Sequence, residues 1–214
     1  MVFKLSGDLN RWGIGKIGRG LINSEKDKFW LDIPKNASQT TIHGLTNRHP
    51  NDGKWVPINS ENFKVNSIQK YLIVRDPIQR WVGSSVELAW HHHKTKSEGN
   101  FFARKNLKEW YDMHARPDLH HLPQWVWARH LDLHDNTTFI IMDNKDIRLK
   151  LNKTFSDYNF DVNVNYSEDN EFKKKIKYRI MDEFMTDHVF VNKLKDYYAE
   201  DYDLLELAYT SSGH

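Results

Sequence analysis

The chain of 214 residues contains no cysteine. Disulfide bonds, thiolate metal ligands and a cysteine nucleophile are therefore excluded. No stretch approaches the roughly 18 consecutive apolar residues that a membrane-spanning helix needs. Residues 1–10 also lack the apolar core of a signal peptide. We therefore expect a cytoplasmic protein with no membrane partner.

An excess of one charge is also missing. Lysine and arginine total 31, aspartate and glutamate total 29, and the net charge is +2. This balance argues against a dedicated nucleic-acid-binding protein, although local basic sites for an anionic ligand are compatible with it. No repeat and no glycine- or proline-rich linker divides the chain. We expect one domain over residues 1–214, long enough to bury a sizeable core, with no element assigned to residues 1–27.

The most informative stretch is residues 28–41. Residues 29–33 are mostly apolar and predict a buried strand. Pro34 ends this strand, and Ser38 can cap a helix that we expect over residues 38–47. A strand, a tight turn and a helix N-terminus form an anion site, because backbone N–H groups and the helix dipole point at the turn. Lys35 adds a full positive charge there.

Three further strands are predicted, at residues 55–58, 70–74 and 137–142. Arg75 directly follows the second of these, and Pro77 suits the first turn of a helix. Strands alternating with helices predict an α/β fold: a central parallel sheet flanked by helices, with ligands at the carboxyl ends of the strands. A long helix is predicted over residues 171–193, from apolar residues that recur at helical spacing.

The segment Pro34-Lys35-Asn36-Ala37-Ser38-Gln39-Thr40 resembles the phosphosulfate-binding loop of the sulfotransferases, which use 3′-phosphoadenosine 5′-phosphosulfate (PAPS). The glycine-rich Walker A pattern is absent. The resemblance implies a P-loop-like nucleotide-binding fold. It also implies that the loop holds the 5′-phosphosulfate and that Lys35 stabilises the leaving group. The implied cofactor-binding residues of this loop are Lys35, Asn36, Ala37, Ser38, Gln39, Thr40 and Thr41.

A second segment, Arg75-Asp76-Pro77-Ile78-Gln79-Arg80, resembles the element with which this family binds the 3′-phosphate. The first arginine and a serine eight residues later make that contact in the family. Arg75 matches, but Gly83 stands at the serine position. We therefore assign the serine contact to Ser84, the next residue.

Three other segments resemble the family in the same order along the chain. Residues 118–124 are similar to an Asp-x-His-x-x-Pro-Gln element of carbohydrate-type members, which implies that His120 and Gln124 bind the acceptor. A capping role for His120 is an equal alternative. Residues 163–167 resemble a His-x-Asn-x-Ser segment, and residues 197–205 resemble the closing helix, for which we expect a structural role.

The resemblance implies transfer of a sulfuryl group from PAPS to a hydroxyl or amine of a small-molecule or glycan acceptor. The general base in related enzymes is a histidine or glutamate between the two phosphate elements. We choose His49, with Glu61 and His43 as alternatives. No metal is expected. His91, His92 and His93 are consecutive, and on a helix they would point in different directions.

Two alternatives remain open. One is a P-loop-type kinase of a nucleotide or metabolite, for which Asp143 would be the metal-binding acid after a strand. The other is a non-catalytic protein on the same fold that binds an anionic ligand through Lys173–Lys177. Magnesium dependence would favour the kinase, and salt-sensitive binding without turnover would favour the binding protein.

Overall fold

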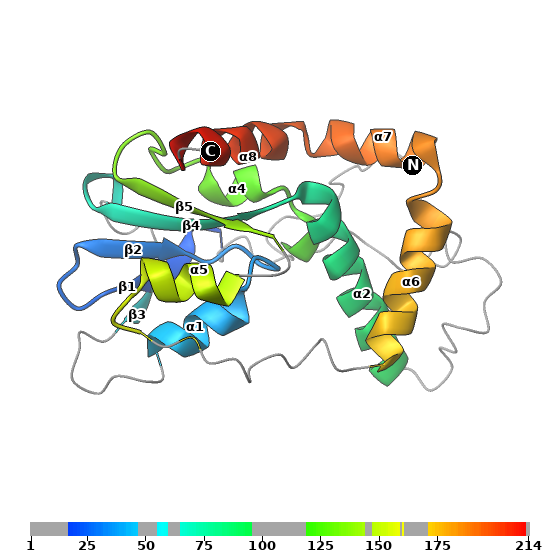
Figure 1. Ribbon diagram of the computed structural model, residues 1–214, viewed down its shortest axis with the longest axis horizontal. Coiled ribbons are helices and arrows are strands. Elements are labelled where there is room, and N and C mark those ends of the chain that lie inside the picture. The colour runs from blue at the N-terminus through cyan, green and yellow to red at the C-terminus, as the bar shows by residue number, and fades with distance from the viewer. Residues whose placement is uncertain are drawn as a thin grey trace.

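The computed structural model describes residues 17–46, 55–59, 65–95, 119–143, 147–158, 160 and 171–212. The fold is α/β, with a five-stranded sheet in the order β3-β1-β2-β4-β5 (Figure 1). The strands are β1 (Arg19–Ile22), β2 (Lys28–Leu31), β3 (Val56–Asn59), β4 (Gln69–Arg75) and β5 (Thr137–Met142). The predicted strands at 29–33, 55–58, 70–74 and 137–142 correspond to β2, β3, β4 and β5.

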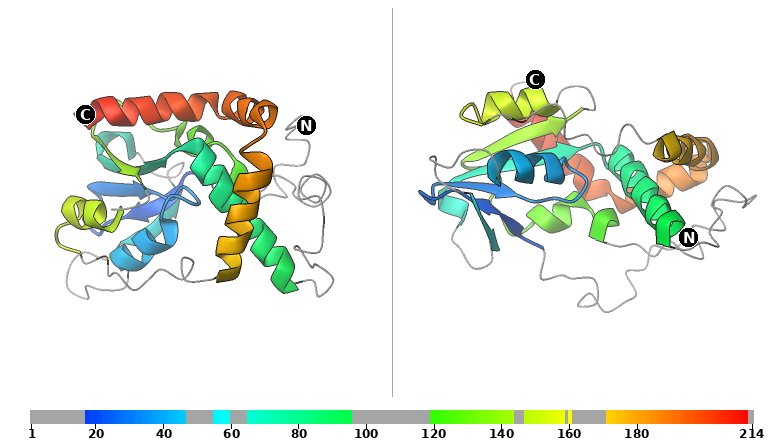
Figure 2. Two further views of the ribbon diagram at one scale, coloured as in Figure 1. Left: turned by 45° about the vertical axis from the view of Figure 1, so that its right-hand side comes forward. Right: turned by 90° about the horizontal axis from the view of Figure 1, so that it is seen from below.

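Helices cover both faces of this sheet (Figures 1 and 2). α4 (Gln124–Ala128) and α8 (Ala199–Ser211) lie on one face, and α1 (Ser38–Thr46) and α5 (Ile147–Thr154) lie on the other. α2 (Pro77–Thr95), α6 (Glu171–Phe184) and α7 (His188–Tyr197) pack together beyond the end of the strands. Two short 3₁₀ helices, η4 (Val65–Ser67) and η5 (Leu119–His121), complete the described elements.

The sheet is mixed, which corrects the expectation of a parallel sheet. β2, β4 and β5 are parallel as expected, but β1 runs antiparallel to both β2 and β3. The turn between β1 and β2 explains this orientation. Asn23 Oδ1 accepts hydrogen bonds from the N–H groups of Asp27 and Lys28, at 3.1 and 3.0 Å. So short a connection makes a hairpin, because a parallel crossover needs a dozen residues or more.

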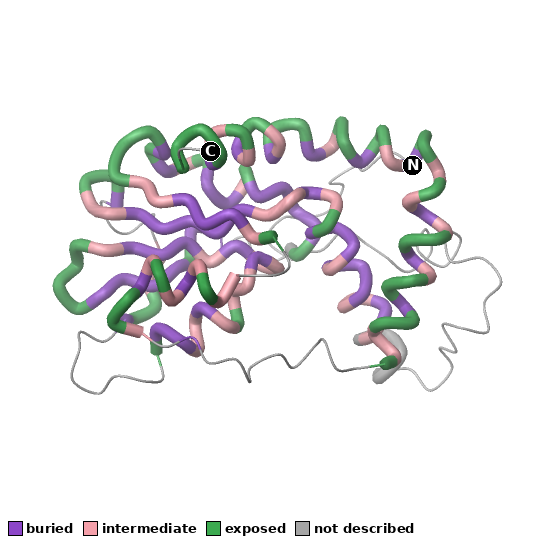
Figure 3. Tube along the Cα trace, viewed as in Figure 1, coloured by how far each residue is buried: buried purple, intermediate pink, exposed green. Residues whose placement is uncertain are grey.

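Alternating side chains of the strands build the two layers of the core. Within β4, Leu72 and Val74 face α4 and α8, whereas Tyr71 and Ile73 face α1 and α5. Both sets are buried, and the strands in the middle of the sheet are largely in the colour of buried residues (Figure 3). A sheet covered on both faces therefore explains why the strand segments read as continuous apolar runs instead of alternating ones.

A separate apolar cluster joins α2, α6 and α7 around Trp81. The predicted helix over residues 171–193 is in fact two helices, because Asp187 caps α7 by accepting hydrogen bonds from the N–H groups of Val189 and Phe190. In one straight helix Phe184 and Phe190 would lie about 120° apart around the axis. With the break, both rings lie against Trp81, at centroid distances of 5.5 and 5.3 Å.

Candidate functional site

The loop between β2 and α1 has an unusual backbone. Lys35 and Ala37 both adopt left-handed conformations, with φ of 69° and 57°. A left-handed residue other than glycine costs on the order of 1–2 kcal/mol. Left-handed conformations in such a turn direct successive backbone N–H groups to one side, which forms an anion-binding concavity. The first turn of α1 adds N–H groups that have no acceptor within the helix.

Polar contacts from beneath hold this strained loop. Arg80 Nε donates to the carbonyl oxygen of Pro34 at 3.0 Å, and Ser38 Oγ donates to that of Ile33 at 2.8 Å. The amide nitrogen of Asn36 donates to the carbonyl oxygen of Ile73 at 2.7 Å. Asn36 is buried, so its side chain fastens the loop to β4. Two of these contacts use the carbonyl oxygens of Ile33 and Pro34, at the start of the loop, and the third uses that of Ile73 in β4.

Gln124 lies at the centre of the supporting network. Its side-chain oxygen accepts hydrogen bonds from Asn36 Nδ2 at 2.5 Å and from the backbone N–H of Arg75 at 3.0 Å. Its amide nitrogen donates to the carbonyl oxygen of Arg75 at 2.8 Å. Gln124 is fully buried. This placement corrects its assignment to acceptor binding: the side chain is engaged inside the protein, where it joins the loop to the end of β4.

Asp201 of α8 fixes Gln124 in turn. Its two carboxylate oxygens accept hydrogen bonds from the backbone N–H groups of Gln124 and Trp125, at 2.9 and 2.8 Å. Burial raises the pKa of Asp201, although these hydrogen bonds and the charge of Arg80 oppose the shift. The segments at 34–41, 75–80, 119–124 and 197–205 therefore meet in one buried polar cluster. The structural role expected for the last segment is borne out by this contact.

Arg75 lies at the carboxyl end of β4, next to the loop. Its Nη1 donates to the carbonyl oxygen of Lys35 at 3.3 Å. Burial and the nearby charge of Arg80 lower the pKa of Arg75, but an arginine remains charged in a protein. A Cβ atom at Gly83 would lie 3.3 Å from Arg75 Nη1. The position where the family has its serine is thus adjacent to the guanidinium.

Ser84 points elsewhere. Its hydroxyl lies 2.7 Å from the carbonyl oxygen of His120 and 3.0 Å from that of Arg80, and the residue is buried. The assignment of Ser84 to a 3′-phosphate is therefore corrected, because its hydroxyl proton is used to attach η5 to α2. Arg80 also donates from Nη1 to the carbonyl oxygen of Leu122 at 2.6 Å, so the second arginine of this segment is structural.

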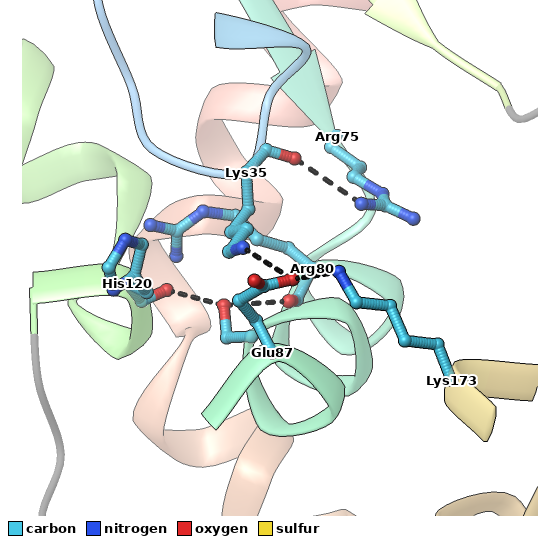
Figure 4. Close-up of polar contacts among 7 residues, drawn as sticks. Lys35, Arg75, Arg80, Glu87, His120 and Lys173 are labelled. Carbon is cyan, nitrogen blue, oxygen red and sulfur yellow. Dashed lines mark hydrogen bonds and ion pairs between the residues drawn. The ribbon is translucent and has the colours of Figure 1, made fainter. Parts of the chain in front are cut away.

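The amine of Lys35 points away from Arg75, towards Glu87 of α2 (Figure 4). Lys35 Nζ lies 3.7 Å from Glu87 Oε2, and Lys173 Nζ of α6 lies 2.8 Å from the same oxygen. Burial acts to raise the pKa of Glu87, but the hydrogen bond from Lys173 and the charges of Lys35, Lys173 and His120 outweigh it. The net result is a pKa below the ordinary value.

Sequence reasoning missed Glu87 and Lys173 as members of this site. One signal was available, because Glu87 lies three and seven residues after Ser84 and Arg80, which places all three on one face of α2. Lys173 belongs to the lysine run that we considered for an anionic ligand. His120 is exposed, and its charge acts on both Asp32 and Glu87. His120 therefore lies near both Asp32 and Glu87, and its role in acceptor binding stays a prediction.

The remaining predicted residues fall into three groups. Thr41 is buried and its hydroxyl donates to the carbonyl oxygen of Ala37, whereas Gln39 is exposed and Thr40 half-buried at the start of α1. Asp143 is exposed and pairs with Lys150 at 2.8 Å. His49, Glu61, the side chains of His91, His92 and His93, and residues 163–167 lie outside the described residues.

Among the described residues, no three histidine, aspartate or glutamate side chains gather as a metal site, and no helix there has the length and apolarity to cross a bilayer. Comparisons of the chain with protein-family models, curated proteins and solved structures found no match.

Proposed function

We propose that this protein is a PAPS-dependent sulfotransferase with a P-loop-like nucleotide-binding architecture. One observation carries the proposal: the two segments that resemble phosphate-binding elements lie side by side. Arg75 Nη1 is 3.3 Å from the carbonyl oxygen of Lys35, because β2 and β4 are adjacent parallel strands that end at the same edge of the sheet. A nucleotide with phosphates at both ends needs two such elements close together.

The residues of the loop fit an anionic group. The left-handed conformations of Lys35 and Ala37 and the first turn of α1 direct N–H groups outward, and Lys35 and Arg75 supply two positive charges. When bound, PAPS supplies the sulfuryl group that passes to the acceptor, while the acceptor gives up a proton. Lys35 and the loop N–H groups would stabilise the charge that develops on the leaving phosphate. Arg75 would anchor the 3′-phosphate as a planar, multiply donating cation.

A thermal-shift comparison tests the proposal directly. Adenosine 3′,5′-bisphosphate should raise the melting temperature more than an equal concentration of adenosine 5′-monophosphate, because a ligand that binds only the native state stabilises it according to its affinity. ATP with magnesium serves as the third ligand and represents the kinase alternative. Equal shifts with the bisphosphate and the monophosphate would remove the 3′-phosphate site, and a dominant shift with ATP and magnesium would favour the kinase.

The Arg75→Ala variant locates the second phosphate. We expect it to weaken bisphosphate binding by about 2–4 kcal/mol in calorimetric titration, the cost of losing a desolvated charge partner. The monophosphate should be affected much less. Arg179→Ala is the control, because it removes a partly buried arginine that pairs with Glu183 on α6. An unchanged dissociation constant in Arg75→Ala would overturn the role of this arginine.

A further inference from the structure

The ion-pair chain of Lys35, Glu87 and Lys173 is asymmetric. Glu87 Oε2 is 2.8 Å from Lys173 Nζ but 3.7 Å from Lys35 Nζ. Lys173 is the least exposed member, with 13% of its side chain accessible, and its amine also lies 5.8 Å from the centre of the Trp90 ring. Glu87 is therefore held firmly by α6 and loosely by the loop. Of the two contacts, the one with Lys35 is the easier to exchange.

The loop lysine therefore has a carboxylate of the protein itself as an anionic partner. An anion that approaches Lys35 meets the charge of Glu87 and replaces it at the amine only if it offers Lys35 a stronger contact. Partly exposed ion pairs of this kind are weak, whereas a phosphate that carries two negative charges makes stronger charge-assisted contacts, so a dianionic phosphate can win this competition. Lys173 keeps Glu87 neutralised when Lys35 turns to the ligand, so the exchange leaves no carboxylate without a cation.

We propose that Glu87 competes with the anionic ligand for the amine of Lys35, and that it thereby sets how much negative charge a ligand needs in order to bind at the loop. The ligand class is a phosphate ester or phosphosulfate that presents at least two negative charges to the loop. This inference rests on the proposed function in that it assigns the loop to an anionic ligand. It concerns the selectivity of the same site, and Glu87 acts through Lys35 as a positioning residue.

The experiment measures binding of two probes, pyrophosphate and adenosine 3′,5′-bisphosphate, by titration calorimetry at fixed salt. Glu87→Gln keeps the shape of the side chain and removes its charge. It should tighten binding of both probes about tenfold, the size of one partly screened charge contact. Glu183→Gln is the matched control, because it removes a carboxylate that pairs with Arg179 within α6. It should leave both affinities unchanged.

A double-mutant cycle separates competition for Lys35 from simple repulsion of the ligand. In a Lys35→Met background the gain from Glu87→Gln should fall below about threefold, because the amine that the carboxylate contacts is gone. A gain of the same size in both backgrounds would overturn the proposal. So would a Glu87→Gln protein that binds both probes no better than the original chain. Should Glu87→Gln fail to fold, Glu87→Ala, which also removes the charge, takes its place with a gain in the same direction.

A second measurement needs no ligand. Acetylation of the Lys35 amine by acetic anhydride, which releases acetate and is followed by mass spectrometry, should become several-fold faster in Glu87→Gln than in the original chain. Lys150, which pairs with Asp143 at 2.8 Å, is the internal reference and should not change. An unchanged rate at Lys35 would overturn the proposal.

The combined results distinguish failure of the competition from failure of the proposed function. If pyrophosphate and the labelling behave as expected but no variant binds the bisphosphate, the proposed function fails and the competition stands. If the bisphosphate binds tightly but Glu87→Gln binds it no better, the proposed function stands and the competition proposal fails.

Discussion

Lys35 combines a strained backbone with a charged side chain, whose two partners in our proposals are Glu87 and an anionic ligand. Its φ of 69° is left-handed, and its amine lies within ion-pair distance of Glu87. Glycine would satisfy the backbone at this position at a lower cost. The lysine therefore requires a reason in its side chain, which the proposed role on the leaving group supplies.

The Lys35→Ala variant tests that role. An interaction that forms mainly in the transition state lowers turnover when it is removed and changes ground-state binding less. We expect sulfuryl transfer from PAPS to fall by roughly two orders of magnitude or more, as for loss of an oxyanion donor. Binding of the bisphosphate should fall less, because the loop amides and Arg75 remain.

The assay for Lys35→Ala uses hydrolysis of PAPS or transfer to a panel of sugars and phenols. Lys150→Ala is the control, because its amine pairs with Asp143. Full turnover in Lys35→Ala with an identified acceptor would show that the loop only cradles phosphate. Tight binding of the bisphosphate by the original chain, with no transfer to any acceptor, would favour the non-catalytic alternative.

For single residues, the sequence predicts the positions of the charged side chains at the loop better than the surroundings of the uncharged polar ones. Lys35 and Arg75 were placed next to a turn and at a strand end, and both positions depend only on local pattern. The sequence predicts ligand contacts for Gln124 and Ser84, but both side chains are buried and hydrogen-bonded within the protein. Whether a polar side chain faces a ligand or a neighbouring element depends on tertiary packing, which a single sequence does not contain.

Among the elements, the break between α6 and α7 positions two aromatic rings on Trp81. Asp187 supports this break by capping α7. Asp187→Ala should lower the free energy of unfolding by about 1 kcal/mol, the usual cost of losing an aspartate cap. Urea denaturation of the original chain and the variant, fitted with one common m-value, measures the difference in their free energies of unfolding.

Asp196→Ala is the matched control, because this exposed aspartate lies in the last turn of α7, where a negative charge opposes the helix dipole. It should leave stability unchanged or raise it slightly. A loss as large as that of Asp187→Ala would mean that the effect comes from removing any aspartate and not from the cap.

The strands illustrate which elements a sequence reveals. β2, β4 and β5 are buried on both faces, so their apolar runs stand out. β1 was missed: its four residues begin with an arginine and a glycine, and its antiparallel direction follows from the Asn23 turn. The sequence predicts one helix over 171–193 because apolar spacing continues across the break, whereas the capping carboxylate is a single residue.

For the whole molecule, Gln124 is the residue that joins otherwise distant parts. Gln124→Ala would leave the backbone N–H and carbonyl oxygen of Arg75 without their buried partner and would free the side chain of Asn36. Unsatisfied buried groups cost about 1–3 kcal/mol each, so we expect a loss of about 2–4 kcal/mol in denaturant unfolding.

Gln79→Ala is the control for Gln124→Ala, because the Gln79 side chain is exposed on α2. It should change stability by less than about 0.5 kcal/mol. If Gln124→Ala were fully stable and lost only acceptor binding, the original assignment of this glutamine to the acceptor would return.

Asp201 gives the molecule a specific pH dependence. Burial raises its pKa above the ordinary 3.8, so between 3.8 and the raised value the native state holds a proton that the unfolded chain releases. The free energy of unfolding therefore falls as the pH rises through this window, and Asp201→Asn lacks this contribution. The variant should be destabilised, but by less at pH 7 than near pH 3.5. Urea melts of both proteins at several pH values test the sign, and a penalty that grows towards pH 7 would contradict it.

The contact between Asp201 and Gln124 has a consequence for synthesis on the ribosome. Within the loop, Asn36 donates a hydrogen bond to Gln124, which lies 88 residues later in the chain. The backbone N–H of Gln124 in turn donates to the carboxylate of Asp201, a further 77 residues on. Chains emerge from the N-terminus, so the strands β2 and β4 can pair while α8 is still being made. The support beneath the anion loop closes only after residue 201 has been translated. A nascent chain therefore lacks this support of the loop until Asp201 has been synthesised and α8 can fold against α4.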